Sequence, residues 1–346
     1  MLKSQRKFGV EVEFVAPSRK AFDSIAMSVD RITTDGSLRP LQWAGEWVSP
    51  ILKGKVGERR VVEACDTLKN YGADCSNPQT SIHIHLDGQR DGGRSERSRS
   101  RDKESTRSIG ISNALMKLLT EEQINSLLTG RNNLTIMPEH VRTDLDEVTY
   151  YSRGRLTRHP RMNYRYYHFY QSDRFNWLKN IFIFYTQYSD VMQAIVSRSR
   201  RRTNMYCQAL SDSFDIQDIM EAQDINTLQA VWYKATGPGG NYNDSRYHEV
   251  NLDSYWGKHG TVEIRSHGGT TDANKILLWL RLHQHIADKL ENMTPEQVLR
   301  EFKEPKDVFI SFLEFVSDDE LLEEYVKRLL GYYSGIKITG DKVTGI

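Results

Sequence analysis

The sequence lacks the features that mark several large classes of protein. Its three cysteines, Cys65, Cys75 and Cys207, are an odd number without CxxC spacing. This excludes a disulfide framework and a zinc knuckle, and it predicts free thiols in a reducing compartment. No apolar run approaches the roughly 20 residues that span a bilayer, and the first residues pass directly into a strand pattern without the apolar core of a signal peptide. We therefore expect a soluble, cytoplasmic protein with no membrane partner.

A net charge of one sign is also missing. Lys and Arg number 47 against 46 Asp and Glu, so the composition does not indicate a duplex-DNA-binding protein. The sequence contains neither GxxxxGK[ST] nor GxGxxG, so any nucleotide would not be held by a P-loop or a Rossmann turn. The chain of 346 residues has no internal repeat and is long enough for one large domain or two smaller ones.

The segment Phe8–Val15 (FGVEVEFV) has the period of two expected of a strand with one buried face. Glu11 and Glu13 therefore leave the strand on the same side, roughly 7 Å apart at 3.3 Å per residue. On a solvated face this pair would mean little, but two unpaired acids that line a cleft require a cation. The segment Leu41–Pro50 is predicted to return as a strand that carries Glu46.

The segment Ser81–Asp87 (SIHIHLD) repeats this design with imidazoles. His83 and His85 face one way, and the isoleucines and the leucine face the other. Two imidazoles on one strand face are frequent in metal and phosphate sites, although a pair of surface histidines fits the same pattern.

A third strand of this kind is TVEIRSH at 261–267. Its alternation places Glu263 and Arg265 on one face together with His267, opposite the valine and the isoleucine. The pair is either an in-strand salt bridge or a functional pair, with the carboxylate on a cation and the forked guanidinium on a phosphoryl oxygen.

Strands scattered in this way, joined by long helical stretches, do not indicate regular βαβ winding. They predict an α+β fold, with a mainly antiparallel sheet, helices on its apolar face and a polar trough on the other. Helices are expected over Glu58–Tyr71, Ile216–Lys234 and most of 274–332, and Arg246–Leu252 is expected to be a strand. The segment 88–108 has no apolar residue and is predicted to be a mobile charged loop, which either closes over the trough or has no role.

Arginines cluster at Arg198 and Arg200–Arg202. With the tyrosines of 150–170 they could bind RNA or single-stranded DNA, where bases stack on aromatic rings. They follow no recognisable nucleic-acid motif, and a solvated helix face or a phosphate-binding cluster fits as well. We do not expect a nucleic-acid partner, but a non-catalytic nucleic-acid-binding module stays open as an alternative.

The acids, imidazoles and arginine gain meaning when they are taken together. Hard oxygen ligands suit Mg²⁺ or Mn²⁺, and metal ions with nearby arginines are typical of phosphoryl transfer from a nucleotide. A metal-dependent phosphodiesterase or nuclease would use the same groups with water as the nucleophile, and this second alternative also stays open.

The order of four segments resembles the amidoligase family, whose members are carboxylate–amine ligases related to glutamine synthetase and glutamate–cysteine ligase. The segments are FGVEVEF, the DGS turn with GEWVSPIL, NPQTSIHIHLD and RYHEVNLDSYWGKHGTVEIRSHGGTTDANKILLWL. None of them would suffice alone, but their order and the combination of ExE, E-x-VSP, HxH and ExR are specific.

This resemblance implies one catalytic domain over 1–346, with a curved sheet of glutamine-synthetase-like type lining an ATP and metal trough. It also implies an ATP-dependent condensation of a small-molecule or peptide carboxylate with an amine. The carboxylate takes the γ-phosphoryl group of ATP to give an acyl phosphate, and the amine then displaces phosphate to leave an amide.

The resemblance further implies roles for individual residues. The implied ligands of Mg²⁺ or Mn²⁺ are Glu11, Glu13, Glu46, His83 and Glu263. The implied contacts to the nucleotide, phosphate or substrate carboxylate are His85, Arg201, Arg202, Arg246 and Arg265. The implied catalytic residues are Arg265 on the transferring phosphoryl group, Glu263 on its cation and Asp35 near the amine.

Overall fold

The structure is a computed structural model that describes residues 4–34, 38, 41–88, 175–233, 244–256, 260–340 and 342–345. Within this part of the chain six strands form one sheet: β1 (Phe8–Val15), β2 (Ile32–Thr33), β3 (Ala44–Val48), β4 (Ser81–Asp87), β5 (Val250–Asn251) and β6 (Thr261–Gly268). Their order is β2-β3-β1-β4-β6-β5, and every neighbouring pair is antiparallel. The predicted α+β class and the mainly antiparallel sheet are confirmed.

Helices surround this sheet. The helices that precede β6 in the sequence are α1 (Arg19–Ser28), α2 (Gly54–Asn70), a helix over 175–187, α8 (Ser189–Ala194), α9 (Ile216–Glu221), α10 (Ile225–Tyr233) and α11 (Asp253–Trp256). After it they are α12 (Ala273–Leu290), α13 (Pro295–Val298), α14 (Pro305–Val316) and α15 (Glu320–Ser334), followed by a hairpin of β7 (Lys337–Thr339) and β8 (Lys342–Thr344). No helix among the described residues is both long enough and apolar enough to cross a membrane.

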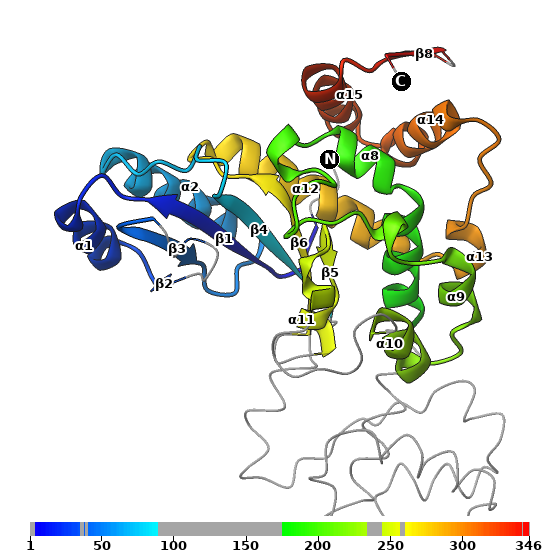
Figure 1. The fold of residues 1–346 in the computed structure, drawn as a ribbon, viewed down its shortest axis with the longest axis horizontal. Helices are drawn as coiled ribbons and strands as arrows, with labels where there is room; N and C mark the ends of the chain where they lie inside the picture. Colours follow the sequence, from blue (N-terminus) through cyan, green and yellow to red (C-terminus); the bar gives the residue numbers. More distant parts are fainter. Residues whose placement is uncertain are drawn as a thin grey trace, which may run out of the picture.

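The apolar side chains of the central strands form the core. Val10, Val12 and Phe14 of β1 are fully buried, as are the isoleucines and the leucine of β4. Helices α2 and α12 lie together behind this face of the sheet (Figure 1). A Cβ at Gly57 of α2 would lie 2.8 Å from the side chain of Leu52, so glycine is what lets this helix approach so closely.

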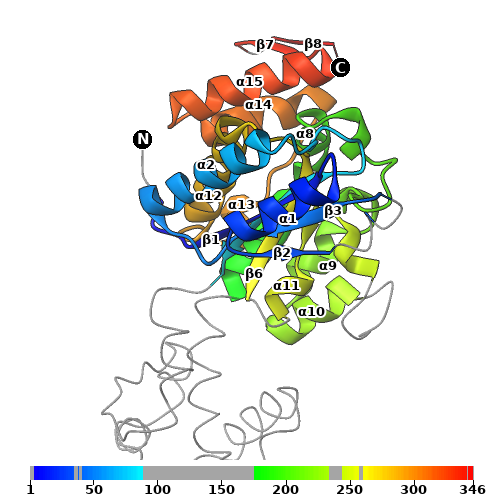
Figure 2. The ribbon, with the colours of Figure 1, turned by 90° about the vertical axis from the view of Figure 1, so that its left-hand side faces the viewer.

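Two groups of the remaining helices lie at opposite ends of the part of the chain that the structure describes. Helices α14 and α15 lie at one end with the β7–β8 hairpin, and α9, α10 and α11 lie at the other (Figure 2). The helix over 175–187 packs on α12, where the Tyr185 hydroxyl lies 2.6 Å from Nδ1 of His283 and Trp177 donates to the carbonyl of Ala287.

The sheet register determines which side chains meet on the other face. Glu11 of β1 lies opposite His83 of β4, and His85 of β4 lies opposite Glu263 of β6. Residues that lie directly opposite one another on antiparallel strands have neighbouring side chains. The predicted acid and imidazole segments are therefore adjacent strands of one sheet, with their polar side chains on one face.

A β-bulge changes one predicted orientation. Ile84 pairs with Ile264 but Ile82 pairs with His267, so two residues of β6 stand opposite the single residue between the isoleucines. Beyond the bulge the two faces of β6 exchange, and His267 shares the face of Ile82. Its ring packs against Trp279 of α12, with 5.2 Å between the ring centroids. The prediction that His267 lies beside Glu263 and Arg265 is therefore wrong.

Other boundaries also differ from the prediction. The predicted helix over Ile216–Lys234 is two helices, because the Asp224 side chain accepts from the backbone N–H groups of Asn226 and Thr227 and so starts α10 anew. Arg246 lies in a 3₁₀ turn over Asp244–Tyr247 and not in a strand. The predicted loop beyond residue 88 and the tyrosine-rich patch lie outside the described residues.

Candidate functional site

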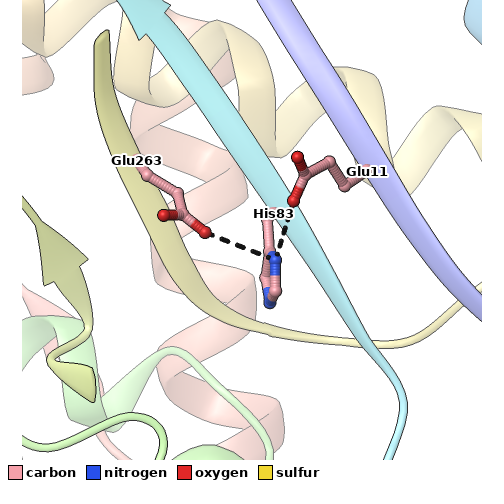
Figure 3. Close-up of side chains that lie close together, drawn as sticks. All are labelled: Glu11, His83 and Glu263. Carbon is pink, nitrogen blue, oxygen red and sulfur yellow. Dashed lines mark hydrogen bonds and ion pairs between the residues drawn. The ribbon is translucent and has the colours of Figure 1, made fainter. Parts of the chain in front are cut away.

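Three carboxylates from three strands meet at one nitrogen atom. Nδ1 of His83 lies 3.1 Å from Oε2 of Glu11 and 3.4 Å from Oε1 of Glu263. Figure 3 shows these two carboxylates pointing at the imidazole from the strands on either side. Oε1 of Glu46 on β3 lies 3.9 Å from the same nitrogen. A single proton on Nδ1 could bond only one of these oxygens well.

The hydrogen bonds around Ser81 assign the protons of His83. The Ser81 hydroxyl donates to Oε2 of Glu13 at 2.6 Å and lies 2.8 Å from Nε2 of His83. Because the hydroxyl has one proton and a carboxylate only accepts, Ser81 accepts from Nε2–H of His83. Nδ1 is therefore the nitrogen that faces the carboxylate oxygens, where it can donate to Glu11 or, without its proton, be a ligand of a cation.

His85 carries positive charge next to Glu11. Its Nε2 lies 3.2 Å from Oε1 of Glu11, and its Nδ1 lies 3.0 Å from the hydroxyl of Thr261. Burial acts to lower the pKa of His85, but the carboxylate of Glu11 outweighs it and raises the pKa to about 9. Burial likewise acts to raise the pKa of Glu11, but the charge of His85 and hydrogen bonds from both imidazoles hold it well below its ordinary value.

Glu263 is held by one cation and one amide. Arg265 Nη1 donates to its Oε1 at 2.6 Å, and Asn251 Nδ2 donates to its Oε2 at 2.7 Å. Burial acts to raise the pKa of Glu263, but the charges of Arg265 and of the two histidines lower it. The carboxylate is therefore ionised although its residue is only 5% exposed. Sequence reasoning missed Asn251 and the linking role of Ser81, because neutral side chains next to a motif carry no distinct signal.

The arrangement fits a divalent cation. Among the described residues, Glu11, His83 and Glu263 offer ligand atoms that all lie within 4.8 Å of one another. Two carboxylate oxygens and an imidazole nitrogen suit Mg²⁺ or Mn²⁺. Glu46 lies next to this set, with Oε2 accepting from the hydroxyl of Thr33. Glu13 contacts the set through Ser81, opposite Glu46 across the β1–β3 pair.

A cavity of about 370 Å³ adjoins this cluster and is lined by Glu13, Ser81, Arg200 and Arg265 together with residues 203–206. Arg200 is only 3% exposed, and its Nη2 donates to the carbonyl of Arg265 at 2.8 Å. Within the described part of the chain, Nε of neither arginine has a hydrogen-bond partner. Two buried guanidinium groups on one cavity are suited to an anion.

The structure gives two other predicted arginines different partners. Arg201 donates to the carbonyl of Tyr333 at 2.6 Å and so holds the end of α15. Arg202 forms exposed ion pairs with Asp190 and Asp212. Their predicted role as phosphate contacts gains no support from these positions, whereas Arg200 lines the cavity.

The described structure does not test the roles predicted for two further residues. The guanidinium group of Arg246 lies over the ring of Tyr247, 5.0 Å from its centroid. Asp35 lies outside the described residues, so its predicted place near an amine stays a prediction.

Comparison with known families gives a match over about the middle of the chain. Residues 171–287 match a family described as "Putative amidoligase enzyme". The matched range contains β5 and β6 with Asn251, Glu263 and Arg265, and β1, β3 and β4 precede it. The match confirms the resemblance indicated by the sequence motifs and supports an amide-forming, ligase-type enzyme. No curated protein and no solved structure matches the chain.

Proposed function

We propose that this chain, which matches the amidoligase family over residues 171–287, is an ATP-dependent carboxylate–amine ligase. One observation carries the proposal: carboxylates of Glu11, Glu46 and Glu263 converge on Nδ1 of His83 beside a cavity that contains two buried guanidinium groups. Such a site combines a place for a cation with a place for the anionic groups that exchange a phosphoryl group. The antiparallel sheet with one polar face also supports a glutamine-synthetase-like fold.

Glu11, His83 and Glu263 would hold Mg²⁺ or Mn²⁺, with Glu46 next to them. The ion would neutralise charge on the phosphate oxygens of ATP. Ser81 and Glu13 fix the tautomer of His83, so that Nδ1 and not Nε2 faces the ion. Asn251 fixes the carboxylate of Glu263 in the same way.

Arg265 and Arg200 would bind the anions of the reaction. A carboxylate becomes a useful electrophile only when one of its oxygens is made into a leaving group. A substrate carboxylate oxygen attacks the γ-phosphorus, ADP leaves, and an acyl phosphate forms. The amine nitrogen then attacks the acyl carbon, and phosphate leaves with the carboxylate oxygen. Fixed guanidinium groups in a buried cavity stabilise the charge that develops on these oxygens.

The test is phosphate release from Mg-ATP in the presence of amino acids, short peptides or polyamines. Wild type is compared with Glu263→Gln, and Glu314→Gln on the exposed face of α14 is the matched control. We expect one class of compound to stimulate release in wild type and in the control. In Glu263→Gln we expect the stimulated rate of phosphate release to fall about 10²–10³-fold, as it does when a group that stabilises transition-state charge is removed.

Two results would contradict the proposal. One is that no compound stimulates release and Mg-ATP does not bind. The other is that the protein cleaves nucleic acid without ATP, since this would assign the same acids to a nuclease. Binding of nucleic acid that survives Glu263→Gln and weakens steeply with salt would instead indicate a non-catalytic module.

A further inference from the structure

Glu13 occupies a different place from the carboxylates that face His83. Among the described residues, Glu13 lines the cavity of about 370 Å³, whereas Glu11 and Glu263 do not. The ligand atoms that lie within 4.8 Å of one another come from Glu11, His83 and Glu263, and within the described chain Glu13 does not join them. Its carboxylate therefore adjoins the cavity rather than the place proposed for the cation.

The carboxylate of Glu13 has fewer donors than those of its neighbours. Glu13 is only 2% exposed, and within the described part of the chain its hydrogen bond is the one from the Ser81 hydroxyl to Oε2. Glu11 contacts two imidazoles, and Glu263 bonds both a guanidinium group and an amide. A buried carboxylate with a single neutral donor lacks the partner that its charge requires.

The surroundings of Glu13 increase this requirement. Glu13 lies directly opposite Glu46 on β3, and like charges in this position on antiparallel strands are unfavourable. The two guanidinium groups that share the cavity donate elsewhere, Arg265 to Glu263 and Arg200 to a backbone carbonyl. Oε1 of Glu13 is therefore left for a positively charged group that enters the cavity.

An ammonium group fits this place better than a metal ion does. Mg²⁺ requires an octahedral set of oxygen ligands, and Glu13 stands apart from the other metal-binding groups. An ammonium group requires hydrogen-bond acceptors. Besides Oε1 of Glu13, the cavity wall carries the amide of Gln79 and the hydroxyl of Thr203, whose side chains form no hydrogen bond among the described residues.

We propose that Glu13 binds the ammonium group of the amine substrate and is not a metal ligand. The inference rests on the proposed function, because that function is what brings an amine to the cavity. Simple alkylamines carry a positive charge at pH 7, as the lysine side chain does. Arg265 and Arg200 then hold the anionic acyl phosphate in the same cavity, and Glu13 holds the amine beside it.

Mn²⁺ binding separates this role from that of a metal ligand without depending on catalysis. Glu13→Gln keeps an oxygen that can accept from Ser81 and removes the charge. In a titration followed by electron paramagnetic resonance, we expect Glu13→Gln to bind Mn²⁺ as tightly as wild type, whereas Glu263→Gln loses about tenfold or more. A comparable loss in Glu13→Gln would assign Glu13 to the metal ion and overturn the inference.

The charge of the amine provides the second test. Phosphate release from Mg-ATP is measured with a pool of N-acetylated amino acids as carboxylates. The amine is either methylamine, an ammonium ion at pH 7, or hydroxylamine, which is uncharged at that pH. Glu13→Gln should raise KM for methylamine about tenfold, because a charge-assisted hydrogen bond is lost. It should leave KM for hydroxylamine and for ATP nearly unchanged. The control Glu314→Gln, on the exposed face of α14, should change none of the three.

The two assays separate failure of this inference from failure of the proposed function. If wild type responds to the amines but Glu13→Gln changes KM for both of them equally, or for neither, the role of Glu13 is wrong and the ligase function stands. If no combination of carboxylate and amine stimulates release in wild type, the ligase function and the role of Glu13 are both contradicted.

Discussion

Glu249 and Glu263 are two buried glutamates of the same sheet region, and their carboxylates behave in opposite ways. Glu249, just before β5, is fully buried, and its donors among the described residues are neutral: the Ser189 hydroxyl, the Gln193 amide and the N–H of Leu210. Burial therefore raises the pKa of Glu249 to about 7. Glu263 is nearly as buried, but Arg265 and two imidazoles lower its pKa.

The difference separates a structural acid from a candidate functional one. Every oxygen of Glu249 has a neutral donor, so this carboxyl joins α8 to the start of β5 without need of a cation. The carboxylate of Glu263 lies around one imidazole nitrogen together with those of Glu11 and Glu46, so a cation placed there would meet several carboxylate oxygens. Burial alone would have marked both residues as candidates, and the charge of the partners distinguishes them.

The largest expected effect comes from removing the cation that holds Glu263. Arg265→Met leaves a buried carboxylate without its partner, which costs about 3–5 kcal/mol of folding free energy. The matched control is Arg202→Met, whose ion pairs with Asp190 and Asp212 are exposed and worth at most about 1 kcal/mol. Urea unfolding of both variants measures the difference. If both variants lose the same free energy of unfolding, the buried pair of Arg265 and Glu263 is worth no more than the exposed ion pairs of Arg202.

The second prediction concerns the pH dependence of Glu249. Its folded pKa of about 7 lies above the ordinary value of 4.5, so protonation favours the folded state. This contribution is fully present below pH 4.5 and is lost as the pH rises through 7, and its size is on the order of 3 kcal/mol. Glu249→Gln keeps the size of the side chain and one accepting oxygen and removes the titration, so its urea midpoint should change less than that of wild type between pH 5 and 8. If the urea midpoints of the two proteins change with pH in the same way, Glu249 does not have a raised pKa in the folded state.

The smallest expected effect concerns the orientation of His83. Ser81→Ala removes the group that accepts from Nε2 of His83, and we expect the affinity for Mn²⁺ to fall about tenfold, at the lower end of the range for outer-shell partners of metal ligands. Ser81→Thr restores the hydroxyl and should restore the affinity. Calorimetric titration with Mn²⁺ measures both variants. If the Mn²⁺ affinity falls in both variants, or in neither, the Ser81 hydroxyl does not position the imidazole.

Much of the site could be predicted from the sequence because strands have a short and rigid period. The alternation in Phe8–Val15 and Ser81–Asp87 gave the correct strand bounds, and it placed Glu11, His83 and His85 on one face of the sheet. The order of strands and their register do not follow from periodicity, since they depend on pairing between segments far apart in the chain.

The errors have specific physical causes. The bulge in β6 adds one residue to the strand without changing its pattern, so the face of His267 could not be read from alternation. Within the arginine run, Arg200 lines the cavity, but Arg201 turns to the carbonyl of Tyr333, which is 132 residues away in the sequence. Three consecutive arginines are equivalent in the sequence until such tertiary contacts distinguish them.

The central claim is that Glu11, His83 and Glu263 hold a divalent cation, and Mn²⁺ binding followed by electron paramagnetic resonance tests it most directly. Wild type, Glu263→Gln and Glu249→Gln are titrated under the same conditions. The account predicts equal Mn²⁺ affinity in wild type and Glu249→Gln, and a loss of about tenfold or more in Glu263→Gln, in line with the 10–100-fold losses seen even for outer-shell partners. Equal affinity in all three proteins, or no bound Mn²⁺ in wild type, would contradict it.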